Sequence, residues 1–262
     1  MTTVRHNDGR SLPGAVLRSI GSILLGLTAV FLVWEFVVYA AGIRPFYLPP
    51  PTAIAQAILA APQAYIDAFL KTFTETVIGF VSGSAFGIGV GLLFFRFRLL
   101  RDLVFPIFII SQTIPVIAFG ALVVLWLGNS LAAKAAIAFY LSFFPVAIHT
   151  LIGLRSADAK QVQLMRSFGA SWSQILFKLQ FPSALPKIFV ALKLAASLGL
   201  LGAIVGEWFG DTTGLGVILI QAMFSENVTA LYAAILVSAL LGTTLYWIVS
   251  FFDRRIVFWR AE

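Results

Sequence analysis

The chain has 262 residues, of which 60% are hydrophobic and 11% charged, and its mean hydropathy is +0.97. A soluble domain carries about 25% charged residues, so the composition excludes a water-soluble enzyme and indicates a protein whose solvent is the lipid bilayer. The net charge of +7 would suit a nucleic-acid partner, but the basic residues lie between hydrophobic stretches, as membrane topology requires. The absence of cysteine excludes disulfides, and two histidines alone cannot form a metal site.

Six hydrophobic stretches predict six transmembrane helices, because a spanning helix needs about 20 apolar residues. They lie near residues 20–42, 72–95, 104–127, 132–154, 188–209 and 229–251. With the N-terminus inside, the inner segments contain fifteen of the 18 Lys and Arg residues and the outer segments contain three. By the positive-inside rule, this asymmetry predicts an all-α integral membrane protein with both termini in the cytoplasm.

The polar residues 1–18 predict a cytoplasmic tail, followed by one transmembrane domain over residues 19–262. The first hydrophobic stretch is longer than the h-region of about 7–15 residues in a signal peptide, so we expect it to remain uncleaved. After it, the prolines within residues 44–52 predict an extended segment. Residues 53–69 then predict a short helix along the outer surface.

Glycines spaced four apart predict close helix packing in two of the expected spans, because small residues on one face let a neighbouring backbone approach. The second span contains Gly79, Gly83, Gly87 and Gly91, and the end of the fifth contains Gly202, Gly206 and Gly210. The pattern leaves open whether these interfaces are static or move during function.

The expected third span carries the most polar patch at mid-membrane depth. Gln112 and Thr113 precede Pro115, which frees a backbone carbonyl and bends a helix. These groups either line a solute pathway or make hydrogen bonds between helices, and the sequence leaves both open. If they line a pathway, Phe143 and Phe144 on the next span are candidates for its apolar closure.

Three acidic residues lie in or near the expected spans: Glu35, Glu75 and Glu207. A charge at the bilayer centre costs about 2.5–3.5 kcal/mol on insertion scales, so we expect these side chains to face protein or water. Glu75 and Glu207 lie near the outer ends of their spans, which favours interfacial side chains that reach water. Glu35 lies deeper, and the sequence does not identify its partner.

Residues 155–187 form a basic, amphipathic segment between the fourth and fifth spans. Its apolar residues recur at helical spacing and are Val162, Met165, Phe168, Trp172, Ile175 and Leu179. Gly169 is expected to break this helix, and Pro182 to end its second half. A broken amphipathic helix held between spans is typical of a docking segment for a partner protein rather than of a membrane crossing.

This segment resembles the cytoplasmic loop of binding-protein-dependent ABC importer permeases. The pattern of that loop is Glu-Ala-Ala, three residues, Gly, nine residues and Ile-x-Leu-Pro. Gly169 and Pro182 match it in register, with Leu179 in place of the Ile and Phe181 in place of the Leu. The Glu-Ala-Ala positions carry Gln163, Leu164 and Met165, which is a clear departure.

The resemblance extends over nearly the whole chain. It points to the nitrate, sulfonate and taurine branch, which includes permeases for pyrimidine thiamine precursors and riboflavin. The motifs that carry it are Trp34-Glu35, Leu48-Pro49-Pro50-Pro51, Gln112-Thr113-Ile114-Pro115, Leu125-Trp126-Leu127-Gly128, Phe143-Phe144-Pro145, Gly206-Glu207-Trp208 and Gly214-Leu215-Gly216.

The resemblance implies a type I ABC importer permease of a bacterial inner membrane, which moves a small anion or vitamin precursor of the kinds just named. Its partners would be a second copy of itself, two cytoplasmic ATPase subunits and an extracytoplasmic solute-binding protein. The loop, including Ala170 beside Gly169, would couple ATP hydrolysis to transport. ATP and Mg²⁺ would bind to the ATPase and no cofactor to this chain, which lacks a Gly-x-x-x-x-Gly-Lys loop.

Two other classes of protein remain open from the residues alone. A secondary transporter or channel without an ATPase would use the three acidic residues as gradient-coupling groups. An integral-membrane enzyme is disfavoured, because no histidine, cysteine or paired-carboxylate constellation supports one.

Overall fold

The computed structural model describes the backbone of residues 12–259 and the side chains of residues 25–259, and every regular element in this part of the chain is helical. The elements are α1 (Leu12–Ala40), α2 (Pro51–Ala60), α3 (Pro62–Arg96), α4 (Arg98–Ser111), α5 (Val116–Leu127), α6 (Leu131–Leu154), α7 (Ala159–Ser167), α8 (Trp172–Ile175), the π-helical turn η1 (Leu176–Gln180), α9 (Phe181–Glu207), α10 (Leu215–Phe224) and α11 (Val228–Ile256). Residues 1–11 of the expected tail lie outside the described residues.

Four stretches of helix are long and apolar enough to cross a membrane by themselves. They are α3, α6, α11 and the continuous helical stretch Trp172–Glu207, which joins α8, η1 and α9. The pair α4–α5 adds a fifth span if the two are counted together, and Leu25–Ala40 of α1 is a shorter apolar stretch. The count of six spans and the orientation of the termini therefore remain predictions.

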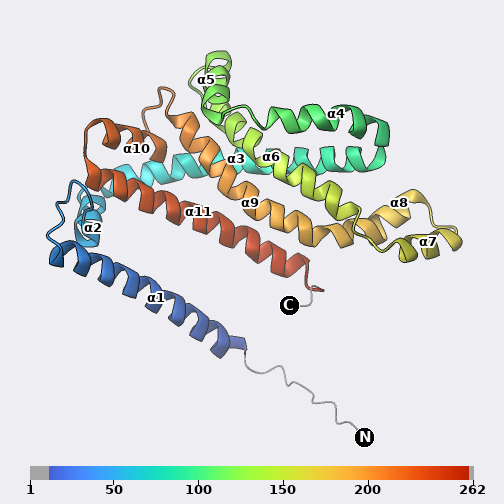
Figure 1. Cartoon of the computed structure of the whole chain (residues 1–262), viewed down its shortest axis with the longest axis horizontal. Helices are drawn as coiled ribbons and strands as arrows, with labels where there is room; N and C mark the ends of the chain where they lie inside the picture. The colour runs from blue at the N-terminus through green and yellow to red at the C-terminus, as the bar shows by residue number, and fades with distance from the viewer. Residues whose placement is uncertain (1–11, 260–262) are drawn as a thin grey trace, which may run out of the picture.

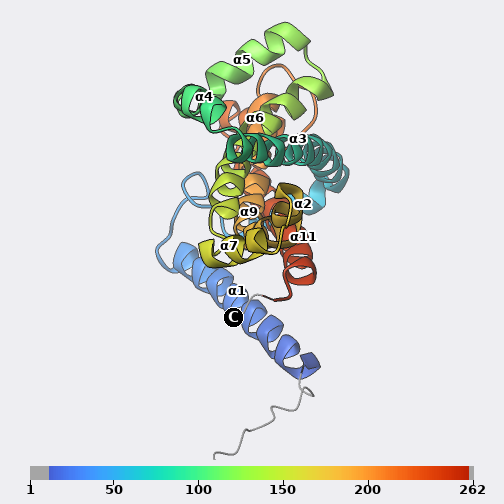
Figure 2. The ribbon, with the colours of Figure 1, turned by 90° about the vertical axis from the view of Figure 1, so that its right-hand side faces the viewer.

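The centre of the molecule is formed by α3, α6 and α9, which cross against one another, while α1 diverges from them (Figures 1 and 2). A Cβ atom on Gly87 of α3 would lie 2.6 Å from the carbonyl oxygen of Phe143 on α6. One on Gly202 of α9 would lie 2.8 Å from the Cα atom of Ala138. The predicted glycine packing faces are confirmed at these contacts. Gly210 differs, because it lies beyond the end of α9 in a turn, with φ of +84°.

The expectation of one continuous helix over residues 104–127 is wrong, because α4 and α5 meet at an angle of 96°. Pro115 has no N–H to donate to the carbonyl of Ser111, so the helical ladder stops there. The hydroxyl of Tyr140 on α6 donates to that freed carbonyl at 2.5 Å. The predicted proline bend is present, but it is large enough to separate two helices.

Gly169 separates α7 from α8 as predicted, and its φ of +76° favours glycine. The expectation that Pro182 ends the second half is wrong, because α9 begins at Phe181 and continues for 27 residues. In the π-helical turn that precedes it, the N–H of Phe181 reaches the carbonyl of Leu176. The π-helical turn interrupts the regular hydrogen-bond ladder just before Pro182, so the helix continues through a residue that has no N–H to donate.

Two smaller differences concern the connections. Helix α2 begins at Pro51, inside the segment expected to be extended, because proline is well tolerated at the first helical position. Helix α10 was not predicted; it has 10 residues, too few to span a bilayer, and follows Gly214. Both short helices lie at the same end of the bundle (Figure 1).

Candidate functional site

The segment between α6 and α9 folds around a corner that is fixed by local caps. Asp158 accepts a hydrogen bond from the N–H of Lys160 at 2.9 Å at the start of α7. Ser171 and Gln174 form a reciprocal capping box at the start of α8, with distances of 2.8 and 3.3 Å. The break at Gly169 is therefore a defined corner between two capped helices.

The outer face of this corner is apolar and exposed to solvent. Phe168 is 81% exposed, Phe177 66% and Leu164 57%. Of the other predicted loop residues, Gln163 and Gly169 are exposed, and Met165, Ala170, Leu179 and Pro182 are half-buried. The corner thus exposes large apolar side chains on a segment that is otherwise polar.

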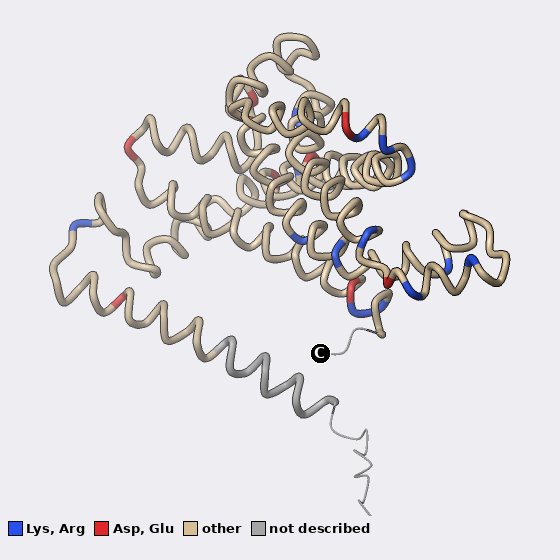
Figure 3. Tube along the Cα trace, turned by 45° about the vertical axis from the view of Figure 1, so that its right-hand side comes forward, with Lys and Arg blue, Asp and Glu red and all other residues tan. Residues whose placement is uncertain are grey.

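The inner face of the corner packs against the ends of α3 and α9. The guanidinium of Arg96 lies 5.0 Å from the ring centroid of Trp172, and Ile175 and Leu176 are buried. A cavity of about 310 Å³ opens beside them and is lined by Phe95, Arg166, Ala170, Trp172, Ile175 and Gln180. Any displacement of α7 and α8 therefore acts on two of the three central helices. In Figure 3 many of the basic residues lie at this end of the molecule.

The residues predicted for a pathway separate into two groups. Gln112, Thr113 and Pro115 are exposed at the corner between α4 and α5, and the Thr113 hydroxyl donates to the carbonyl of its own helix at 2.8 Å. Gln112 and Phe144 line a shared recess of about 290 Å³. Phe143 does not line it; its ring lies 5.7 Å from that of Phe86 and 5.6 Å from that of Phe139.

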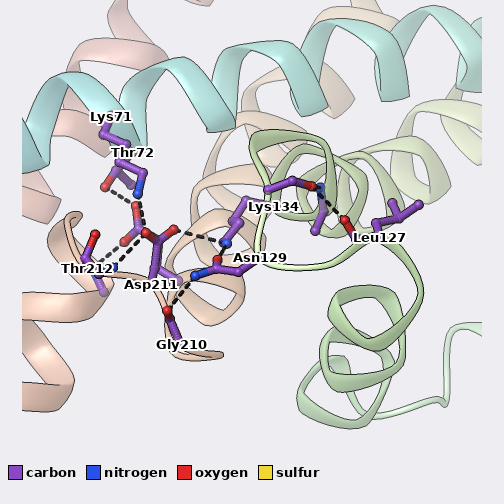
Figure 4. A network of polar contacts seen from close by, with 12 residues as sticks. Lys71, Thr72, Leu127, Asn129, Lys134, Gly210, Asp211 and Thr212 are labelled. Atoms are coloured by element: carbon purple, nitrogen blue, oxygen red, sulfur yellow. Dashed lines mark hydrogen bonds and ion pairs between the residues drawn. The ribbon is translucent and has the colours of Figure 1, made fainter.

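At the end of α9 far from the α7–α8 corner, three helices are joined by a network of ion pairs (Figure 4). Asp211 follows α9 and pairs with Lys71 on α3 and with Lys134 on α6, the latter at 3.1 Å. Burial alone would raise the pKa of Asp211, but hydrogen bonds from Lys71, from the N–H of Thr212 and from Lys134 hold it below its usual value. Asp211 is thus an ionised centre shared by α3 and α6.

Glu75 and Glu207 do not reach water, so the expectation of interfacial side chains is wrong. They are 0% and 1% exposed. Glu207 accepts hydrogen bonds from the hydroxyl of Thr72 and from the N–H of Gly216, both at 2.6 Å. Thr72 in turn accepts from the N–H of Leu215 at 2.9 Å. These contacts bring together the Gly-Glu-Trp and Gly-Leu-Gly motifs, which are separate in the sequence.

Glu35 has a partner that the sequence did not identify. Its carboxylate accepts hydrogen bonds from the N–H and the hydroxyl of Thr52, at 3.1 and 2.7 Å. Thr52 lies in the first turn of α2, where free N–H groups and the helix dipole favour a negative charge. Glu35 therefore joins α1 to α2.

The ion pairs of Asp211 were not predicted. Lys71 and Lys134 were counted only as outer basic residues, and Asp211 was not singled out. The available signal was an acid and two lysines next to apolar spans, where an unpaired charge is costly.

The family model for the binding-protein-dependent transport system inner membrane component matches residues 83–258. The chain belongs to this family. The permease is 30% identical over 234 residues to a "Probable ABC transporter permease protein" of Haemophilus influenzae, which covers 89% of this chain and 96% of that protein.

Two further relatives carry names of solutes. The permease is 31% identical to the "Formylaminopyrimidine transport permease protein ThiX" of Halalkalibacterium halodurans, over 89% of this chain and 93% of that protein. It is 29% identical to the "Taurine transport system permease protein TauC" of Escherichia coli, over 94% of this chain and 91% of that protein.

Among solved structures, the permease is similar to a chain of the inward-facing MetNI methionine ABC transporter. The TM-score is 0.67 at 20% identity, and the match covers 75% of this chain and 98% of that chain. The predicted type I ABC importer permease fold is confirmed. The protein is a multi-pass inner-membrane permease subunit of an importer for small solutes, and ATP hydrolysis belongs to separate subunits. Family membership decides against the gradient-driven transporter, the channel and the enzyme.

Proposed function

We propose that two copies of the permease enclose a solute pathway on their two-fold axis. Two ATPase subunits, which hold ATP and Mg²⁺, dock on residues 155–187, and a separate binding protein delivers the solute to the opposite side. The observation that carries the docking proposal is the exposed apolar corner around Gly169. Phe168 is 81% exposed there although it lies between two capped helices, as expected of a side chain that fits into a partner.

The departure at Gln163 sharpens this proposal. The family pattern has a carboxylate at this position, and this chain has an uncharged amide. The exposed apolar side chains Leu164, Phe168 and Phe177 are therefore expected to supply most of the docking energy, with little contribution from ion pairs. The association should accordingly depend weakly on salt concentration.

The test of docking compares two equally exposed aromatic residues. Phe168→Ala should weaken ATPase association on the order of tenfold or more, as aromatic anchors at interfaces do. Phe258→Ala is the matched control, since Phe258 is also 81% exposed but lies after α11. The measurement is co-purification of the ATPase with the full-length permease. Equal loss in both variants, or no loss in either, contradicts the assignment.

A second variant tests coupling through the corner itself. Gly169→Asp places a side chain at a φ of +76° and a charge on the docking face, so it should lower ATP-driven transport while leaving membrane insertion intact. If this variant binds the ATPase and transports as the unaltered protein does, the coupling assignment is wrong.

The proposed pathway runs past the corner between α4 and α5. Gln112, Thr113 and Pro115 supply its polar groups, and Phe143 and Phe144 its apolar closure. Gln112→Leu should impair transport without blocking assembly, because it removes a polar group and little volume. A cysteine at position 112 that fails to cross-link to its copy in a second subunit would argue against a route on the two-fold axis.

The recess beside Gln112 favours one of the solute classes named for the relatives. It is lined by Gln112, Tyr140, Leu141, Phe144, Pro145, Ile148, His149, Leu194 and Leu198, among which there is no lysine or arginine. Aromatic walls with an amide and an imidazole suit an uncharged heteroaromatic solute such as a pyrimidine better than a sulfonate or nitrate. Transport by the reconstituted complex with its binding protein should respond to formylaminopyrimidine and not to taurine; the reverse result would refute this choice.

A further inference from the structure

A cluster of five ionisable side chains around Asp211 carries charges that do not cancel. Lys71 and Lys134 are positive, and Asp211, Glu207 and Glu75 carry carboxyl groups. Asp211 forms ion pairs with both lysines. Lys134, Glu75 and Glu207 are at most 1% exposed, so water does not screen the unmatched negative charge. Such an uncompensated buried charge is strongly destabilising.

Glu75 is the group that the rest of the network leaves without a donor. Neither of its side-chain oxygens has an N–H or O–H donor within the described residues. Its carboxyl group lies within hydrogen-bonding reach of the carboxyl group of Glu207. Two ionised carboxylates at this separation would repel each other, whereas one shared proton converts the contact into a hydrogen bond.

The partners of Glu207 decide which of the two acids carries that proton. One oxygen of Glu207 accepts from Thr72 and the other from Gly216, so both already act as acceptors, as those of a carboxylate do. Glu75 has no such donors and must itself donate. We infer that Glu75 and Glu207 form a binding site for one proton, which Glu75 carries and donates to Glu207.

This site would hold α3 to α9 and to the start of α10. The charged groups that face Glu75 are Glu207 on α9, Lys71 one turn earlier on α3, and Asp211 in the following loop. Lys134 on α6 faces Asp211. With the proton bound, two lysines balance two carboxylates and the buried cluster is neutral.

Infrared spectroscopy of the full-length permease in its complex with the ATPase tests the site directly. A protonated carboxyl gives a carbonyl band that shifts in D2O, and this band should be present near neutral pH and absent from Glu75→Gln. Asp67→Asn is the matched control, because Asp67 is an exposed carboxyl on the same helix and its replacement should leave the band unchanged. A band that is missing from the unaltered protein, or that persists in Glu75→Gln, overturns the inference.

The pH dependence of thermal unfolding provides an independent readout. If the folded protein holds one more proton than the unfolded chain, its folding equilibrium constant falls up to tenfold for each unit rise in pH above the ordinary range of a glutamate. Glu75→Gln imitates the protonated acid, so it should fold and lack this part of the slope. An unchanged slope in Glu75→Gln, or a stability that instead rises with sodium concentration, would contradict a bound proton.

Discussion

The two ends of α9 differ in how far their side chains are covered by the rest of the chain. At one end Glu207 is enclosed, and its oxygens are bonded to Thr72 and Gly216 within the chain. At the other end α9 continues through η1 into a corner where Phe168 and Phe177 remain exposed. The hydrogen-bond partners of Glu207 all lie within the same chain, whereas the exposed side chains at the other end lie in the segment for which docking is proposed. The difference separates a contact that can be tested in the isolated permease from one that needs the assembled transporter.

The largest expected effect comes from breaking the enclosed end. Asp211→Ala removes the anionic partner of Lys134, which is 1% exposed and keeps only the amide oxygen of Asn129, and it should lower the free energy of unfolding by about 3–5 kcal/mol. Asp102→Ala is the control, because Asp102 pairs with Arg98 and Arg101 at a site where it is 53% exposed. That variant should change stability by less than about 1 kcal/mol. Unfolding midpoints of the two purified variants check the comparison, and similar values would show that burial does not matter here.

A smaller effect is expected from the packing that holds the enclosed end in place. Gly87→Ala puts a methyl group 2.6 Å from the carbonyl oxygen of Phe143, and such overpacking costs about 1–3 kcal/mol. Gly89→Ala lies on the same helix with no atom within 4 Å and should be neutral or slightly stabilising. The measurement is the thermal unfolding midpoint of both variants. If Gly89→Ala lowers the midpoint more than Gly87→Ala does, the assigned packing face of α3 is incorrect.

The open end should behave in the opposite way. Phe177→Ala removes a side chain that is 66% exposed, so the stability of the isolated permease should change by no more than about 0.5 kcal/mol. Its effect should appear only when the ATPase is present, as weaker association. A loss of stability in the isolated permease would mean that Phe177 packs within its own chain.

The smallest perturbation determines which end faces the cytoplasm. Ser171→Cys and Ser225→Cys introduce single thiols at exposed positions of a cysteine-free chain. Loss of the Ser171 cap should cost about 1 kcal/mol, which still leaves a folded protein to label. With the predicted orientation, a membrane-impermeant thiol reagent added to intact cells labels position 225 and spares position 171. The opposite labelling pattern would reverse the assignment of the two ends.

The sequence predicted the features that depend on local patterns. Apolar runs placed most of the long helices, the four-residue spacing of glycines predicted a close-packing face on α3, and Gly169 marked the corner between α7 and α8. Each of these signals lies within one segment and reflects a property of the backbone there. The glycine face could be found without knowing its partner helix.

What the sequence could not predict depends on contacts between distant segments. Lys71 and Asp211 are 140 residues apart, and Thr72 and Glu207 are 135 apart, so no spacing rule connects them. The prediction that a helix ends at Pro182 was wrong because a π-helical turn before this residue accommodates the proline. The sharp angle at Pro115 required a hydroxyl from another helix to satisfy Ser111.

The continuous helix from Trp172 to Glu207 begins beside the proposed docking corner and ends at Glu207, which contacts Glu75. Its 36 residues make an arm about 54 Å long at 1.5 Å per residue. Over that length, a tilt of about 5° moves the far end by about 5 Å, which exceeds the length of any hydrogen bond around Glu207. If the ATPase tilts this helix at the α7–α8 corner, the tilt alone would break the hydrogen bonds of Glu207 at the opposite end of the helix.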